Sequence, residues 1–124
     1  MRKAAFAIAL LLALSCSTPG EKAVRELATR IVPEYSGKIE FKEVAGEKDF
    51  YEISARKGGI LIKGNNANSL AAGLGRYLDE AGIDVSWYAS QAVECPEEMP
   101  VPDGAIGTEA LVPQRFFLNY CTFG

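Results

Sequence analysis

The stretch NNANSLAAGLGRYLDEAG, residues 65–82, decides the fold because it predicts one long amphipathic helix. Its apolar residues recur every three or four positions, which is typical of a helix that buries one face. Asn65 or Asn66 can cap the start of this helix, and Gly82 suits the left-handed turn that ends it. We therefore expect a helix over residues 67–81 with a buried stripe made of Leu70, Ala71, Leu74, Tyr77, Leu78 and Ala81.

Two glycines, Gly73 and Gly75, lie inside this helix. A glycine in a helix interior costs about 1 kcal/mol relative to alanine. We expect that they compensate by letting the helix backbone approach a sheet closely, because glycine has no Cβ. The alternative is that both are merely tolerated.

Alternation on the N-terminal side of this helix predicts three short strands. Apolar and polar side chains alternate in residues 39–42, 51–56 and 60–63, as in strands with one buried face. Turn-forming residues separate the three runs, so we expect two antiparallel hairpins, that is, a meander. A further amphipathic helix over residues 21–32 precedes them, with Thr18 three residues before Glu21, a capping-box spacing.

The segment after the central helix predicts a fourth strand, residues 85–88. A strand that follows a crossover helix normally joins the sheet parallel and with right-handed connection. The predicted fold is therefore of the α+β or α/β class. It is a small mixed sheet, an antiparallel meander plus one crossover strand, with two helices on one face. We assign residues 21–93 to this domain.

The N-terminus predicts export. Arg2 and Lys3 precede the apolar run AAFAIALLLAL, residues 4–14, and the run is followed by Ser15 and Cys16. A basic start, a short apolar stretch and a small residue before a cysteine resemble a lipoprotein signal. We expect a signal peptide over residues 1–15, lipidation of Cys16, a tether over residues 16–20, and a membrane-anchored lipoprotein. The alternative is an ordinary signal cut nearby, with Cys16 incidental.

The C-terminal part has a different composition. Prolines and glycines are spread through residues 94–113, which predicts an irregular wrapping segment or an interdomain linker. Residues 114–124, QRFFLNYCTFG, are a new apolar run, and we expect them to begin a second domain that continues beyond this chain.

Composition excludes several classes of function. The chain has 13 Lys and Arg against 16 Asp and Glu without a basic cluster, so we expect no nucleic acid partner. It has no histidine, which removes the commonest general base and makes a transition-metal site improbable, and we expect no cofactor. The acidic pairs at residues 79–80 and 97–98 are better explained as solvated surface. Export would permit a disulfide between Cys95 and Cys121, but their spacing does not demand one.

Three segments carry a resemblance to known proteins. Residues 62–78, IKGNNANSLAAGLGRYL, resemble the turn and helix of accessory domains that precede glycosidase barrels. Residues 85–91, VSWYASQ, and residues 115–124, RFFLNYCTFG, are similar to segments of the α-N-acetylglucosaminidases, glycoside hydrolase family 89. In that family a W-x-x-S-Q segment ends the accessory domain and an R-(Y/F)-(Y/F)-x-N-x-C-T segment opens the barrel.

The resemblance implies a downstream (β/α)₈ barrel that hydrolyses terminal α-linked N-acetylglucosamine with retention. Retaining enzymes use two carboxylates, and in this family both lie in the barrel, so the chain should have no catalytic residue and be inactive alone. By the same resemblance, Asn119 and Cys121 match positions that line the sugar pocket at the end of the first barrel strand.

The accessory domain itself is expected to support the barrel through aromatic contacts, with Trp87, Tyr88, Phe116 and Phe117 as candidates. One alternative is a carbohydrate-binding module in which Trp87 or Tyr88 stacks on sugar rings. Another is a complete, non-enzymatic surface lipoprotein.

Overall fold

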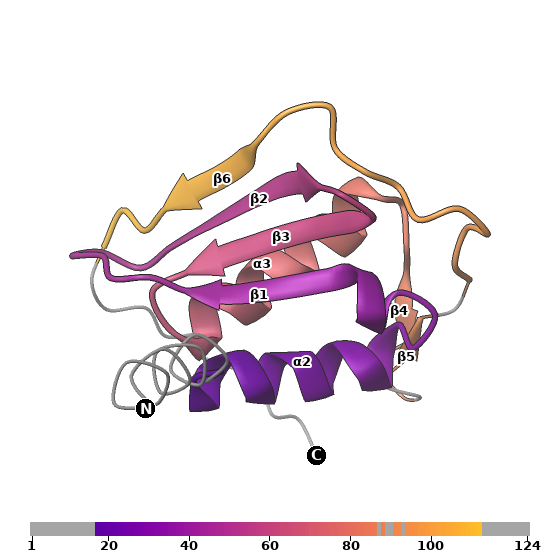
Figure 1. Cartoon of the computed structure of the whole chain (residues 1–124), viewed down its shortest axis with the longest axis horizontal. Coiled ribbons are helices and arrows are strands. Elements are labelled where there is room, and N and C mark those ends of the chain that lie inside the picture. The colour runs from indigo at the N-terminus through magenta and orange to yellow at the C-terminus, as the bar shows by residue number, and fades with distance from the viewer. Residues whose placement is uncertain (1–16, 87, 89–90, 93, 113–124) are drawn as a thin grey trace, which may run out of the picture.

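A computed structural model describes residues 17–86, 88, 91–92 and 94–112 of the 124-residue chain (Figure 1). Helices and strands follow the predicted order, with two additional short strands in the last third. The elements are α2 (Pro19–Ile31), a 3₁₀ turn (Ser36–Lys38), β1 (Ile39–Glu43), β2 (Phe50–Arg56), β3 (Gly59–Gly64), α3 (Ala67–Glu80), β4 (Val85–Ser86), β5 (Gln91–Ala92) and β6 (Ile106–Glu109).

The main sheet has four strands in the order β1-β3-β2-β6. Strands β2 and β3 form the predicted antiparallel hairpin. Strand β1, however, pairs with β3 in parallel and forms no hairpin with β2. The expected meander is therefore wrong at its first turn. Alternation specifies the face that a strand buries, and β1 satisfies it beside either strand. In the observed register, Phe41, Ile62 and Ile53 lie side by side in one buried row.

The predicted crossover strand does not join this sheet. Val85–Ser86 pairs with Gln91–Ala92 in a separate two-stranded sheet. The fourth strand of the main sheet is instead β6, which pairs antiparallel with β2 and comes from the segment expected to be irregular or a linker. The fold class is confirmed, because the sheet is small and mixed and carries two helices.

Both helices cover one face of the sheet, and the core lies between the two layers (Figure 1). Most of the core side chains are those predicted from the helical stripes and from the strand alternation, although Val32, Tyr35 and Ile83 were not predicted and Ala55 is exposed. They include Val24, Ala28, Phe41, Ile53, Ile60, Ile62, Leu70, Leu74 and Leu78. Helix α2 begins at Pro19, two residues earlier than expected, so Pro19 and Gly20 form its first turn and are not a tether. Thr18 and Glu21 make the predicted capping box.

The two helical glycines have different environments. A Cβ on Gly73 would lie 2.7 Å from Cγ2 of Ile62 and 3.2 Å from Cβ of Tyr51, so the predicted close approach to the sheet is confirmed there. It is wrong for Gly75, because a Cβ at that position would meet no described atom within 4 Å. Gly82 has φ +67° and ends α3 in the predicted left-handed conformation.

Candidate functional site

A polar cluster occupies the corner at which β2 begins, β3 ends and α3 starts. We call it the corner network, and its members are Asp49, Asn65, Asn66 and Ser69. Oδ1 of Asp49 accepts hydrogen bonds from the side-chain amides of Asn66, at 2.8 Å, and Asn65, at 3.3 Å. The hydroxyl of Ser69 donates to Oδ1 of Asn65 at 2.9 Å, and Oδ1 of Asn66 caps α3 by accepting from the Ser69 amide at 2.9 Å.

The backbone of Asp49, beside the corner network, also holds the chain just after β6. The amide of Ala110 donates to the backbone carbonyl of Asp49 at 2.7 Å. Gly64 is required beside the network, since a Cβ there would lie 3.1 Å from backbone atoms of Leu70 and Phe50. The next side chains, Leu111 and Val112, are 97% and 51% exposed. The G-N-N-x-x-S pattern of residues 64–69 therefore has a structural use: it ties the end of β3 and the start of α3 to the residue that precedes β2.

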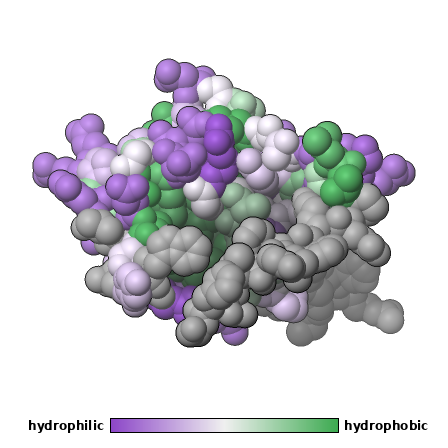
Figure 2. Space-filling view, turned by 180° about the vertical axis from the view of Figure 1, so that it is seen from behind, coloured by the Kyte–Doolittle hydropathy of each residue, from purple (hydrophilic) through white to green (hydrophobic). Residues whose placement is uncertain are grey.

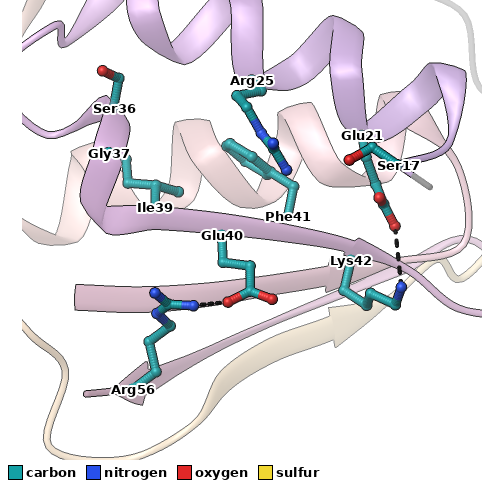
Figure 3. A pocket seen from close by; sticks show the side chains of 10 residues that line it. All are labelled: Ser17, Glu21, Arg25, Ser36, Gly37, Ile39, Glu40, Phe41, Lys42 and Arg56. Carbon is teal, nitrogen blue, oxygen red and sulfur yellow. Dashed lines mark ion pairs between the residues drawn. The ribbon is translucent and has the colours of Figure 1, made fainter. Parts of the chain in front are cut away.

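A second candidate is the groove between α2 and the free edge of β1 (Figure 3). Its carboxylates are already engaged. Glu21, which is 3% exposed, accepts the Glu43 amide at 2.8 Å and the Thr18 amide at 3.2 Å, and lies 3.8 Å from the Lys42 ammonium. Glu40 forms an ion pair with Arg56 across the strands. A retaining glycosidase needs one carboxylate free to attack and one free to exchange a proton, and this groove provides neither.

Two tyrosines hold the segment that follows β5 against the domain. The Tyr77 hydroxyl donates to the carbonyl of Pro100 at 2.9 Å, and the Tyr35 hydroxyl donates to the carbonyl of Pro96. Burial raises the pKa of both hydroxyls; Cys95 and Glu34 add to this for Tyr35, and Tyr35 and Cys95 add to it for Tyr77. Burial also raises the pKa of the Cys95 thiol, with a smaller effect of Glu34. Sequence reasoning missed this clasp, although a buried tyrosine usually needs a partner for its hydroxyl.

Most of the sequence-predicted site residues lie outside the described residues: Cys16, Trp87, Phe116, Phe117, Asn119 and Cys121. Tyr88 is described and its side chain is fully exposed, at 103%. Cys95 forms no disulfide with any described residue. Within the described ranges, no group of acidic or cysteine side chains is arranged to hold a metal ion. None of the described helices is long and apolar enough to span a membrane.

Comparison with known protein families identifies the domain. The family model of the alpha-N-acetylglucosaminidase (NAGLU) N-terminal domain matches residues 22–101. The chain belongs to this family. It is an accessory domain of a family 89 glycoside hydrolase. The match covers most of α2, then β1, β2, β3 and α3, and continues as far as Val101 in the segment that Tyr35 and Tyr77 hold. No curated protein matches the chain in sequence.

Solved structures agree with this NAGLU N-terminal domain assignment. A family 89 glycoside hydrolase from Clostridium perfringens, in complex with PUGNAc, is 25% identical with a TM-score of 0.63 over 73% of this chain. Two further structures of the C. perfringens enzyme, one with 2-acetamido-1,2-dideoxynojirmycin and one with its substrate GlcNAc-alpha-1,4-galactose, are 24% identical with TM-scores of 0.68 and 0.65 over 77%. The chain spans only 11% of the length of each.

Proposed function

We propose that this domain seats and orients a downstream catalytic barrel that hydrolyses terminal α-linked N-acetylglucosamine, in an exported and lipid-anchored enzyme. The observation that carries the proposal is the family match over residues 22–101, because that family is the N-terminal domain of alpha-N-acetylglucosaminidases. The resemblance of residues 115–124 to the segment that opens the family's barrel supports the same proposal.

The geometry of the domain supports a positioning role. The described carboxylates of the β1-edge groove are used in capping and in ion pairs. By contrast, a backbone hydrogen bond from the Ala110 amide to the Asp49 carbonyl holds the chain beside the corner network just after β6. A region that follows Ala110 is thereby tethered to a fixed point of the domain, which suits a support for a site assembled from barrel loops.

Activity tests this proposal directly. The 124-residue chain and a longer protein, extended in frame through the downstream coding sequence, are each incubated with an aryl α-N-acetylglucosaminide. We expect aryl release from the longer protein and none above the blank from the 124-residue chain. Release by the short chain, or none by the long one, would contradict the proposed division of labour.

Lipid anchoring is tested separately at Cys16. Cells that express the chain are grown with an alkyne-bearing fatty acid, and incorporation is detected by conjugation to a fluorophore. We expect labelling of the native chain and its loss in Cys16→Ser, with Cys95→Ser as the matched control that keeps the label. Equal labelling of all three chains would remove the lipoprotein proposal and leave the enzymatic one untouched.

One observation favours a second function, carbohydrate binding by the domain itself. The Tyr88 ring is fully exposed, so it is sterically free to stack on a sugar ring. Titration of the chain with N-acetylglucosamine oligosaccharides, compared between the native sequence and Tyr88→Ala, tests this alternative. Saturable binding that Tyr88→Ala abolishes would establish it.

A further inference from the structure

The helix layer is displaced sideways relative to the sheet. Helix α2 packs on β1 and on α3, whereas α3 packs on β1, β2 and β3. Strand β6 forms the opposite edge of the sheet, and its main neighbour is β2 (Figure 1). The helix-bearing face is therefore well covered near β1 and less covered near β6.

A groove lies at this less covered part, between α3 and β6, and we call it the α3–β6 groove. Phe50 and Tyr51 of β2, Ala72 of α3, and Thr108 and Ala110 on the β6 side contribute to its walls. Seen from the α3 side, hydrophobic side chains gather toward the middle of the face and again where β6 ends (Figure 2). The groove thus presents apolar surface on a domain whose core is otherwise closed.

Asn68 and Ala72 line the groove on its α3 side, and Gly75 comes after them on the same helix. Asn68, Ala72 and Gly75 follow one another at helical spacing and are exposed. Gly75 has no use inside the domain, because a Cβ there would meet no described atom within 4 Å. A glycine that weakens a helix without an internal contact suits close approach by another body from outside.

The opposite face of the sheet differs in character. Its side chains form ion pairs between strands: Glu52 of β2 pairs with Lys63 of the neighbouring β3, and Glu40 of β1 pairs with Arg56 of β2 across β3. The paired side chains are between 38% and 44% exposed. Charged pairs at this exposure are well solvated, and burying them would cost desolvation energy. The open face of the sheet is therefore suited to water, whereas the α3–β6 groove is suited to a protein partner.

The chain itself indicates which partner. Ala110 lines the groove, and the next two side chains, Leu111 and Val112, are apolar and exposed beside it. The related C. perfringens enzymes continue far beyond the length of this domain, which covers 11% of them. Whatever follows Val112 in the chain is covalently tethered to this wall of the groove, which raises its local concentration there.

We propose that the α3–β6 groove, extended by the exposed Leu111 and Val112, is the docking surface for the downstream catalytic region of the same polypeptide. This inference rests on the proposed function, and it names the face through which the domain supports the barrel. The contact would bury Asn68, Ala72 and Gly75 of α3 and leave the ion-paired face of the sheet in solvent.

Thiol accessibility tests the docking surface. Single cysteines are introduced as Ala72→Cys and Thr108→Cys at the groove. Ala23→Cys on α2 and Ser54→Cys on the ion-paired face serve as matched controls, and every variant is made in both the 124-residue chain and the in-frame extended protein. Maleimide labelling rates are read by peptide mass spectrometry, which separates each new thiol from the native cysteines. We expect both groove thiols to react at least about tenfold more slowly in the extended protein, since interface cores exclude solvent, and both control thiols to react equally in the two proteins.

Three outcomes would overturn the inference. Groove thiols that react equally in both proteins would leave the groove unoccupied, and protection of a control thiol instead would place the docking face elsewhere. Protection that grows with protein concentration would assign the groove to a second copy of the chain. Aryl release by the extended native protein is measured alongside. If the enzyme is active but the groove thiols stay accessible, only the docking surface is contradicted. If the enzyme is inactive, the proposed function is contradicted.

Discussion

The β2–β3–α3 unit, residues 50–80, and the clasped segment, residues 94–112, reach their structures by different routes. The unit follows its own sequence pattern, because alternation, turn residues and a helical stripe each specify a local element and bury a shared face. The clasped segment has little pattern of its own. Partners in the unit hold it: Tyr77 binds its backbone at Pro100, and β2 pairs with β6. The difference shows that a proline-rich stretch can be well defined when a folded neighbour supplies its hydrogen bonds.

The largest expected effect is the difference in stability lost when an apolar side chain is truncated in each of the two regions. Ile62→Ala removes a fully buried side chain from the centre of the sheet and should lower the free energy of unfolding by about 2–5 kcal/mol. Leu111→Ala, at a 97% exposed position, should change it by less than about 0.5 kcal/mol. Urea unfolding of the two variants measures both. Similar losses would mean that the end of the clasped segment is as much a part of the core as β3.

The two helical glycines give a smaller effect with opposite signs. Gly73→Ala would force a Cβ to 2.7 Å from Ile62 and should destabilise the domain by about 1–3 kcal/mol, as overpacked sites do. Gly75→Ala meets no described atom and should stabilise the domain by about 1 kcal/mol through helix propensity. Thermal unfolding compares them in the 124-residue chain. Destabilisation by Gly75→Ala would show that this position has an internal contact after all.

Removal of one clasp hydroxyl should loosen the second region and spare the first. Tyr77→Phe deletes the hydrogen bond to Pro100 and should cost about 1 kcal/mol. Amide hydrogen exchange should rise in residues 94–105 and stay unchanged in β3. Tyr51→Phe is the matched control, because the Tyr51 hydroxyl has no hydrogen bond to any described residue. Equal exchange in the two variants would contradict the clasp.

The Tyr35 and Tyr77 hydroxyls predict that the free energy of unfolding depends on pH in the alkaline range and not near neutral pH. Burial raises the pKa of Tyr35 and Tyr77 above the ordinary value of 10.0. Below that pH both folded and unfolded chains keep these protons, so their contribution to stability is complete. Above it the unfolded chain loses its protons first, and stability falls as the pH rises toward the folded values. Urea unfolding across this alkaline range should show a shallower fall in the Tyr35→Phe, Tyr77→Phe double variant, and an unchanged fall would exclude these groups as its cause.

The fold could be predicted from the sequence where each residue's role is local. The helical stripe with Asn66 and Gly82 at its ends placed α3, and the capping-box spacing of Thr18 and Glu21 placed α2. The strand beside which β1 lies could not be predicted, because the alternation of Ile39 and Phe41 fits β2 and β3 equally well. Strand β6 could not be predicted either, since Ile106 is its one large apolar residue and β2 supplies the pairing that makes it a strand.

The candidate site, too, could be predicted only in the part that depends on local sequence. The asparagines were expected as helix caps, but the role of Asp49, which lies 16 and 17 residues earlier in the chain, depends on three elements that meet only in the folded domain. Asn119 and Cys121 remain predictions from family resemblance, because they lie outside the described residues.

The parallel pairing of β1 with β3 also sets an order of events during synthesis. Strand β1 emerges before β2, yet its only partner strand is complete only when Gly64 has been added. Strand β1 can therefore pair only after β3 has been synthesised. Ile39 and Phe41 consequently reach their places in the sheet later than their position in the chain suggests.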